Sequence, residues 1–212
     1  MKNNSQYTSA FTACSFLFAE FNAVLPLLRS DNADVLLKEE VVNRNHIMVN
    51  NEASAKRIIY EFKRRYKSVP HEFWEWYDSL EETAQKAALL YVIIKTYKLI
   101  FDFHIHVTIK KWNSVDHTIA TEDLQLELLD VSANDEFVDS WSELTKKKLI
   151  SAYLTILRQA DMLDSKTNEL KPLRLIPHEC KYYVECGDTW FLDACLMTPM
   201  DRENIINYYK GF

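Results

Sequence analysis

Residues 51–67 read NEASAKRIIYEFKRRYK, and this stretch gives the clearest structural signal in the chain. Apolar residues recur in it at spacings of three and four, which is typical of an amphipathic helix. These residues are Ala55, Ile58, Ile59, Phe62 and Tyr66. Asn51 or Asn50 can cap the start, and Glu52 suits the first turn of a helix. The pattern predicts a helix over 52–67 with its apolar side against a core.

The opposite side of this predicted helix is cationic. Five cations and one aromatic residue fall on it, namely Lys56, Arg57, Tyr60, Lys63, Arg64 and Lys67. Within the helix only Glu61 opposes them, at the flank and close to Arg65. A dense cationic face on a rigid helix is a surface that a polyanion can bind. An ordinary solvated helix face has the same pattern, so both interpretations stay open at this point.

Glycine is scarce, since the 212 residues include only two. Glycine-rich phosphate loops, dinucleotide-binding turns and tight hairpins all depend on this residue. A nucleotide-binding fold or a meander of short strands is therefore disfavoured. Long helices capped by Asn, Asp and Ser are the alternative, and we predict a mainly α protein.

The N-terminal third reads as three helices. A strongly apolar helix is predicted over 9–29 and a second one over 33–42, both before the basic helix. Three helices with a basic third one resemble a helix-turn-helix unit, in which the last helix approaches DNA. The loop NRNHIMVN is longer than a strict helix-turn-helix allows, so the match is loose.

A longer helix follows and is predicted to be central. Ser79 and Glu82 have the spacing of a capping box, and the helix they open runs to about Phe103. Its residues are apolar on nearly all sides, which is typical of a buried helix. Two neighbouring aromatic residues, Trp74 and Trp76, precede it and are predicted to pack in the core, with base stacking as the alternative.

The second half is predicted to form a separate lobe. Residues 113–120 read as a boundary, which divides the chain into domains 1–112 and 113–212. LKPLRLI at 170–176 and KYYVEC at 181–186 are β-branched or aromatic runs. We predict that they pair as a small β ribbon. The expected architecture is a two-lobed helical protein, with a helix-turn-helix-like N-terminal bundle and a winged-helix-like C-terminal lobe.

Charge is unevenly distributed along the chain. The net charge is −6, yet residues 1–70 hold ten Lys/Arg against seven Asp/Glu. Residues 115–143 hold nine Asp/Glu and no Lys/Arg. Such asymmetry suggests two surfaces with different partners, although the acidic segment also fits a solvated linker. Lys147 and Arg158, on a helix predicted from Ser142 to Met162, form a second and weaker basic spot.

The remaining features point to a cytoplasmic protein. The four cysteines include no CxxC pair, and MKNNSQYT lacks the apolar region of a secretory leader. The longest apolar run in the middle of the chain, AALLYVII, is far short of the roughly 20 residues that span a membrane. We expect reduced thiols and no membrane association.

The sequence contains little that indicates a catalytic site or a metal site. His104 and His106 lack third and fourth ligands at a recognised spacing, and His178 with Cys180 and Cys186 reads as structural. Cys195 is a possible fourth member of that cluster, but buried thiols are the simpler interpretation. Asp102 could be a buried acid, but no paired carboxylate or nucleophile is placed by the sequence to work with it. We therefore expect no enzyme activity, no cofactor and no metal.

Four stretches resemble a known family: EASAKRIIYEFKRR at 52–65, AQKAALLYVIIKTYKLIFDF at 84–103, WSELTKKKLISAYLTILRQADMLD at 141–164 and GDTWFLDACLMTPMDRENI at 187–205. Together they resemble the BrxA family of bacteriophage exclusion (BREX) defence systems, often described as NusB-like. Residues 113–135 and the ends match least. The resemblance implies an α-helical nucleic-acid-binding protein in a bacterial cytoplasm. It also implies a place beside a DNA methyltransferase, an ATPase and an alkaline-phosphatase-like component.

Three functional hypotheses follow. The first is a non-catalytic accessory protein that binds double-stranded DNA through phosphate contacts from the basic helix, aided by Lys147 and Arg158. The second is an adaptor that docks other defence proteins through its acidic segment. The third is an RNA-binding protein that stacks single-stranded bases on aromatics such as Tyr60 or Trp74.

Overall fold

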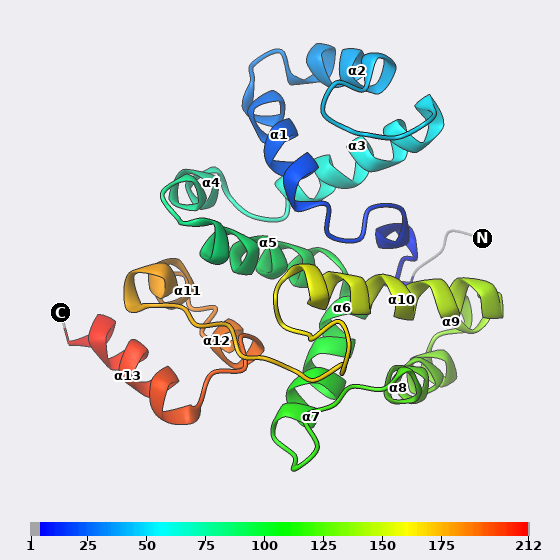
Figure 1. Cartoon of the computed structure of the whole chain (residues 1–212). Coiled ribbons are helices and arrows are strands. Elements are labelled where there is room, and N and C mark those ends of the chain that lie inside the picture. Colours follow the sequence, from blue (N-terminus) through cyan, green and yellow to red (C-terminus); the bar gives the residue numbers. More distant parts are fainter. Residues whose placement is uncertain (1–4, 212) are drawn as a thin grey trace.

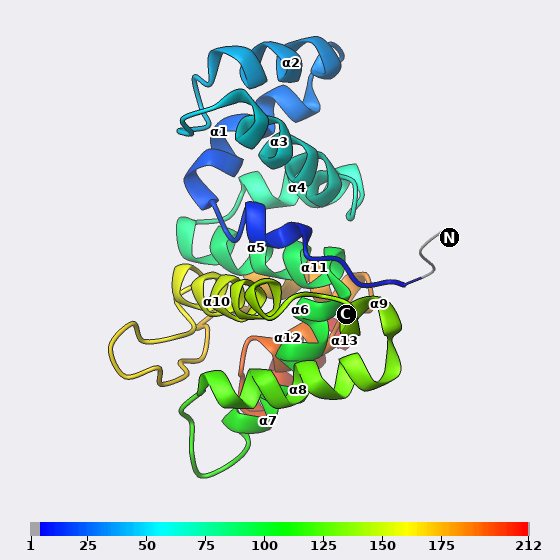
Figure 2. The same ribbon diagram turned by 90° about the vertical axis from the view of Figure 1, so that its right-hand side faces the viewer.

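The structure is a computed structural model that describes residues 5–211. It is mainly α, as the scarcity of glycine predicted. The outer limits of the two predicted domains, at residues 1–4 and 212, lie outside the described residues. The N-terminal third contains η1 (Ala10–Ala13), α1 (Phe18–Arg29), α2 (Ala33–Asn43) and α3 (Glu52–Tyr66). Both views place α1–α3 together at one end of the molecule (Figures 1 and 2).

The middle of the chain forms the layer on which this bundle rests. It contains α4 (His71–Asp78), α5 (Glu82–Thr96), α6 (Lys98–Asp102), the π-helical turn η2 (Phe103–Thr108) and α7 (Ile109–Trp112). Residues 87–94 of α5 are all buried, so the helix is central as predicted. Burying each large apolar side chain stabilises the fold by about 1.5–3 kcal/mol.

The second half packs around α5–α7. It contains α8 (Thr121–Asn134), α9 (Glu136–Asp139), α10 (Glu143–Gln159), η3 (Pro177–Cys180), α11 (Lys181–Glu185), α12 (Trp190–Ala194) and α13 (Pro199–Lys210). In Figure 1, α8 and α9 lie on one side of α6–α7, and α11–α13 lie on the other. A single hydrophobic cluster includes residues from both sides of residue 112. The division into lobes stays a prediction.

The predicted β ribbon is wrong. Residues 181–185 form α11, and residues 171–176 have no regular secondary structure, with Lys171 N–H donating to Met162 O and Leu173 N–H to Cys195 O. The reason is the packing of two consecutive tyrosines. Tyr182 and Tyr183 both contact the ring of Trp76, at 5.3 Å between centroids in each case. A strand would turn them to opposite faces, whereas a helical turn lets both reach one aromatic cluster.

Two predicted helices are interrupted. The apolar run 9–29 breaks between η1 and α1, where Leu17 has a φ of 51° in the left-handed region. The predicted helix to Phe103 breaks at Tyr97, which has extended backbone and separates α5 from α6. The predicted capping box also fails, because the side chain of Ser79 donates to Trp76 O at 2.6 Å and α5 begins after Glu81.

The aromatic residues beside α3 lie in the core, as predicted. Trp74 is fully buried, and its indole N–H donates to Tyr66 O at 3.1 Å. Trp76 is half-buried and stacks on Tyr182. Stacking of a nucleic-acid base on Trp74 is therefore excluded in this fold.

His104 on the π-helical turn joins the middle of the chain to α10 and α12 of the second half. Its Nε2 lies 2.8 Å from Ala194 O, and its Nδ1 lies 3.0 Å from the hydroxyl of Tyr153. A carbonyl only accepts, so Nε2–H donates and Nδ1 accepts the Tyr153 proton. The hydroxyl of Thr108 then donates to Tyr153 at 2.6 Å. Burial lowers the pKa of His104 to about 4, so the ring is neutral at pH 7.

This buried histidine predicts a pH-dependent stability. Its pKa is about 4 in the folded protein against an ordinary 6.5, so the unfolded chain binds the extra proton between these values. Stability should be full above pH 6.5 and fall toward pH 4 by about 3 kcal/mol. Urea unfolding at a series of pH values measures this. The exposed-histidine variant His178→Asn should keep the slope, and His104→Asn should flatten it. Equal slopes in both variants would contradict the assignment.

Candidate nucleic-acid interface

The local sequence forms α3 as predicted. Asn51 is the N-cap, and its side-chain oxygen accepts the N–H of Ser54 at 2.8 Å. The apolar stripe faces inward, with Ala55, Ile58, Ile59 and Phe62 buried and Tyr66 half-buried. The cationic side is consequently turned away from the core. This orientation is what makes α3 a candidate interface.

Arg65 fixes α3 to the rest of the molecule and is fully buried. Its guanidinium donates to the main-chain oxygens of Cys14, of Ser15 at 2.6 Å and of Phe16 at 2.9 Å. Its Nε also lies 3.4 Å from the hydroxyl of Tyr97. These acceptors lie at the two places where the predicted helices break. A buried charge with this many partners is tolerated because hydrogen bonds replace its hydration.

Glu61 completes this buried polar group. It is 3% exposed and accepts the hydroxyl proton of Tyr97 at 2.7 Å. Its other neighbour is Arg64, whose guanidinium lies 3.9 Å from the Glu61 carboxylate and 5.2 Å from the centre of the Tyr97 ring. Arg64 is therefore partly held by the chain itself, although a third or more of its side chain remains exposed.

The outward face of α3 is divided between free and engaged cations. Lys56, Arg57 and Lys67 are exposed, and no carboxylate of residues 5–211 forms an ion pair with any of them. Tyr60, 67% exposed, lies among them on the same helix. Lys63 differs, because its Nζ lies 2.6 Å from the carboxylate of Asp34 at the start of α2. The hydrogen bond from Lys63 lowers the pKa of Asp34.

The two residues of the predicted second basic spot, Lys147 and Arg158, both lie on α10 but have different surroundings. Lys147 is exposed and borders a groove between α8 and α10. Arg158, near the other end of the helix, is half-buried and donates to the side-chain oxygen of Asn168 at 2.8 Å. Arg158 thus holds the loop that follows α10. The structure gives no contact that joins either residue to the cationic face of α3.

The candidate metal ligands do not converge. His104 is buried in the network described above, whereas His106 is exposed and lies 2.7 Å from Glu127. Cys180 and Cys195 are buried free thiols, and Cys186 is an exposed one. Within residues 5–211 no group of three or more His, Cys, Asp or Glu side chains is placed to hold a metal ion. Every helix in that range is too short or too polar to cross a lipid bilayer.

Sequence reasoning missed two residues that shape this face. Arg65 stands seven positions after Ile58 and three after Phe62, so its position on the buried stripe was a usable signal. Asp34 lies 29 residues before Lys63, and no local pattern links the two.

The buried guanidinium gives a stability prediction. Arg65→Met should lower the free energy of unfolding by about 3 kcal/mol or more, because several buried oxygens lose their donor and Glu61 loses a neighbouring cation. Arg57→Met removes the same group from an exposed position of the same helix and should stay within about 0.5 kcal/mol of the parent. Urea unfolding measures both. Equal effects would show that Arg65 does not anchor the helix.

Comparison with known proteins identifies the family. A sequence model of the BrxA family matches residues 5–185. The BREX protein BrxA of Bacillus cereus (strain H3081.97) is 26% identical over 166 residues, covering 78% of this chain and 83% of that protein. A crystal structure of an uncharacterized protein from Magnetospirillum magneticum matches with a TM-score of 0.75 and 18% identity, over 90% of this chain and 98% of that chain. At this identity the structural match shows a shared fold.

The fold and the cationic helix define an all-α protein with a candidate surface for polyanions. The sequence match is more specific: the chain belongs to the BrxA family, whose members are proteins of BREX phage-defence systems. The family resemblance found from the sequence is confirmed.

Proposed function

We propose that this protein is a non-catalytic accessory protein of a BREX system that binds double-stranded DNA through the cationic face of α3. The observation that carries the proposal is the exposure of Lys56, Arg57 and Lys67 on one helix without an ion pair to any carboxylate among residues 5–211. Lys63 and Arg64 add two cations that phosphates can recruit from their internal partners. Phosphate contacts carry little sequence information, so binding is largely independent of sequence.

The net charge restricts where DNA can bind. At −6 overall, the protein repels a polyanion from most of its surface and attracts it only where cations gather. Duplex DNA is favoured over single-stranded RNA because Trp74, one of the two aromatics considered for stacking, is buried. Of Tyr60 and Trp74, only Tyr60 is exposed for stacking with a base. The cytoplasmic location and the partnership with methyltransferase, ATPase and phosphatase-like components, which the family resemblance implies, are part of the same proposal.

The first test is the salt dependence of duplex binding, measured by fluorescence anisotropy. Five phosphate contacts predict a slope of roughly −4 for log K against log[salt]. The triple variant Lys56→Glu, Arg57→Glu, Lys67→Glu should bind at least about tenfold more weakly. Lys166→Glu, Lys181→Glu, Lys210→Glu changes the net charge equally on exposed positions elsewhere and should bind nearly as well as the parent.

The proposal is wrong if the protein does not bind duplex DNA at low salt. It is also wrong if the two triple variants lose the same amount of duplex affinity. Competition with single-stranded RNA separates the remaining alternative. If RNA displaces the duplex at lower concentration, and Tyr60→Ala weakens RNA binding more than duplex binding, the RNA hypothesis replaces the DNA one.

The ion pair between Asp34 and Lys63 gives a second test. DNA must compete with Asp34 for Lys63, so Asp34→Asn should raise duplex affinity about threefold at low salt. Glu39→Gln removes the same charge from an exposed position of the same helix that forms no ion pair within residues 5–211, and it serves as the control. Identical effects of the two variants would mean that only net charge matters and that Lys63 makes no phosphate contact.

A further inference from the structure

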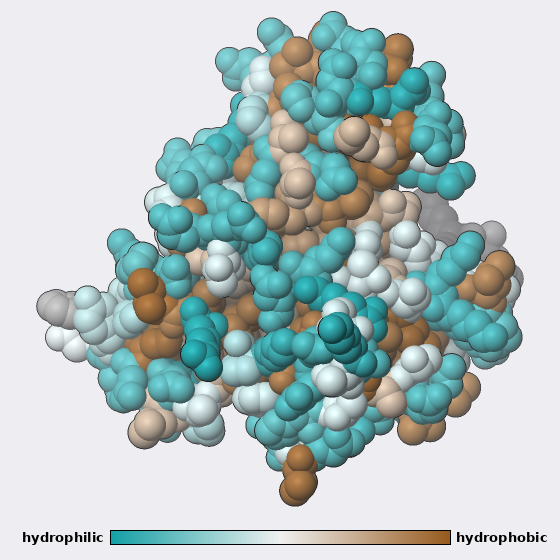
Figure 3. Space-filling model, viewed as in Figure 1, coloured by the Kyte–Doolittle hydropathy of each residue, from teal (hydrophilic) through white to brown (hydrophobic). Residues whose placement is uncertain are grey.

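Helix α8 has apolar residues on two faces. Leu124, Leu128 and Val131 are buried toward the body of the protein. Leu126 and Leu129 are 67% and 61% exposed, and Ala133 is exposed beyond them. The spacing of 126, 129 and 133 is three and then four, so these residues form a stripe on the solvent side of the helix. Figure 3 shows hydrophobic residues at the surface on this side of the molecule, amid a mostly hydrophilic face.

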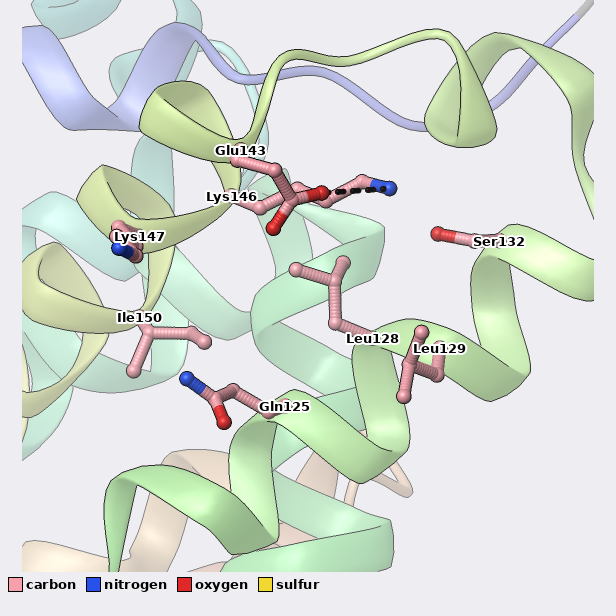
Figure 4. Close-up of a pocket in the computed structure, with 8 residues that line it drawn as sticks. All are labelled: Gln125, Leu128, Leu129, Ser132, Glu143, Lys146, Lys147 and Ile150. Carbon is pink, nitrogen blue, oxygen red and sulfur yellow. Dashed lines mark ion pairs between the residues drawn. The ribbon is translucent and has the colours of Figure 1, made fainter.

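A groove between α8 and α10 adjoins the stripe. Its lining residues are Gln125, Leu128, Leu129, Ser132, Glu143, Lys146, Lys147 and Ile150. In Figure 4 the side chain of Leu128 lies between the two helices, and the hydroxyl of Ser132 points into the space between them. The groove has a volume of about 190 Å³, which suits one or two apolar side chains. Leu129 belongs to both the groove and the stripe, so the two form one surface.

The groove also holds an unsatisfied polar group. Ser132 is 8% exposed, and its hydroxyl oxygen has no hydrogen-bond partner among residues 5–211. Buried hydroxyls are nearly always paired, because an unpaired one costs about 1–3 kcal/mol.

The α8 and α9 side of the stripe is acidic, whereas the α10 wall of the groove carries Lys147 and Lys146, the latter paired with Glu143. Helices α8 and α9 contain six Asp/Glu and no Lys/Arg. Two of these acids are paired outside the stripe, Asp123 with Lys111 at 3.0 Å and Glu127 with His106 at 2.7 Å. Four others are exposed and form no ion pair with any described residue, namely Glu122, Asp130, Glu136 and Asp139. Glu122 lies one turn before Leu126, and Asp130 lies one turn after it.

We propose that the stripe and the groove are a docking surface for a basic amphipathic helix of another protein. Leucines at helical spacing beside a groove bind a partner helix through anchors at spacings of three and four. The exposed acids require lysine or arginine beside those anchors. A second copy of this chain does not fit, because symmetric pairing would bring the same acids together. Nucleic acid does not fit either, because the phosphates would meet Glu122 and Asp130.

This surface is separate from the cationic face of α3 and does not depend on DNA binding. The probe that tests it is a labelled synthetic peptide of about 20 residues, long enough to form a helix, with leucines at spacings of three and four and lysines around them. A second peptide carries glutamate in place of each lysine. The lysine peptide should bind at least about tenfold more tightly than the glutamate peptide by fluorescence anisotropy.

The variants locate the binding. Leu126→Gln with Leu129→Gln should weaken the lysine peptide about tenfold and leave duplex DNA affinity unchanged. Val115→Gln, which removes a fully exposed apolar residue elsewhere, should have no effect. Glu122→Gln with Asp130→Asn should weaken the peptide several-fold and reduce its salt dependence.

Three outcomes would overturn the proposal. The first is no binding of the lysine peptide, and the second is binding that the two leucine substitutions do not change, which would reduce the surface to a cluster of acids. The third is a dimer of the parent protein, seen by sedimentation, that the leucine substitutions abolish. In that case a second copy covers the stripe.

Discussion

The buried guanidinium of Arg65 is the contact on which the N-terminal part of the structure depends. It binds the main-chain oxygens of residues 14–16, where the backbone leaves helical geometry and those oxygens lack helical partners. It also reaches Tyr97, where α5 ends. One side chain of α3 therefore fixes the segment before α1 and contacts the junction after α5. Because Arg65 fixes the buried side of α3, the cationic face on the opposite side of the helix has a fixed orientation.

This arrangement separates two kinds of positive charge on one helix. Arg65 is buried, and several main-chain oxygens replace the water that would otherwise solvate its guanidinium. Three cations are exposed and form no ion pair within residues 5–211, namely Lys56, Arg57 and Lys67. Two more are partly exposed and paired, Lys63 with Asp34 and Arg64 with Glu61. Counting cations along α3 therefore overstates the charge that is freely available to a ligand. The acidic residues of α8 and α9 lie on a different part of the molecule, so attraction for a polyanion is local rather than general.

The sequence predicted correctly those features that depend on residues close together in the chain. The stripe of α3, the Asn51 cap and the burial of α5 follow from side-chain periodicity and capping chemistry, and the structure confirms them. The breaks at Leu17 and Tyr97 were missed because they depend on Arg65, whose acceptors are 32 to 51 residues away in the chain. The β ribbon was wrong because tyrosine propensity for strands was outweighed by aromatic packing. The roles of Lys147 and Arg158 also depend on distant neighbours that no spacing reveals.

The π-helical turn at Phe103–Thr108 determines which way the side chains that follow it face. A π turn accommodates one residue more than an α-helix of the same path, so everything beyond it is rotated by about 100°. Lys111, which pairs with Asp116 and Asp123, owes its direction to that offset. The number of residues in this segment therefore sets which side of α7 each of its side chains occupies, while His104 and Thr108 hold the turn itself against Tyr153. Deleting one residue here would turn the side chains of α7 by about 100° about the helix axis while leaving the composition of the helix almost unaltered.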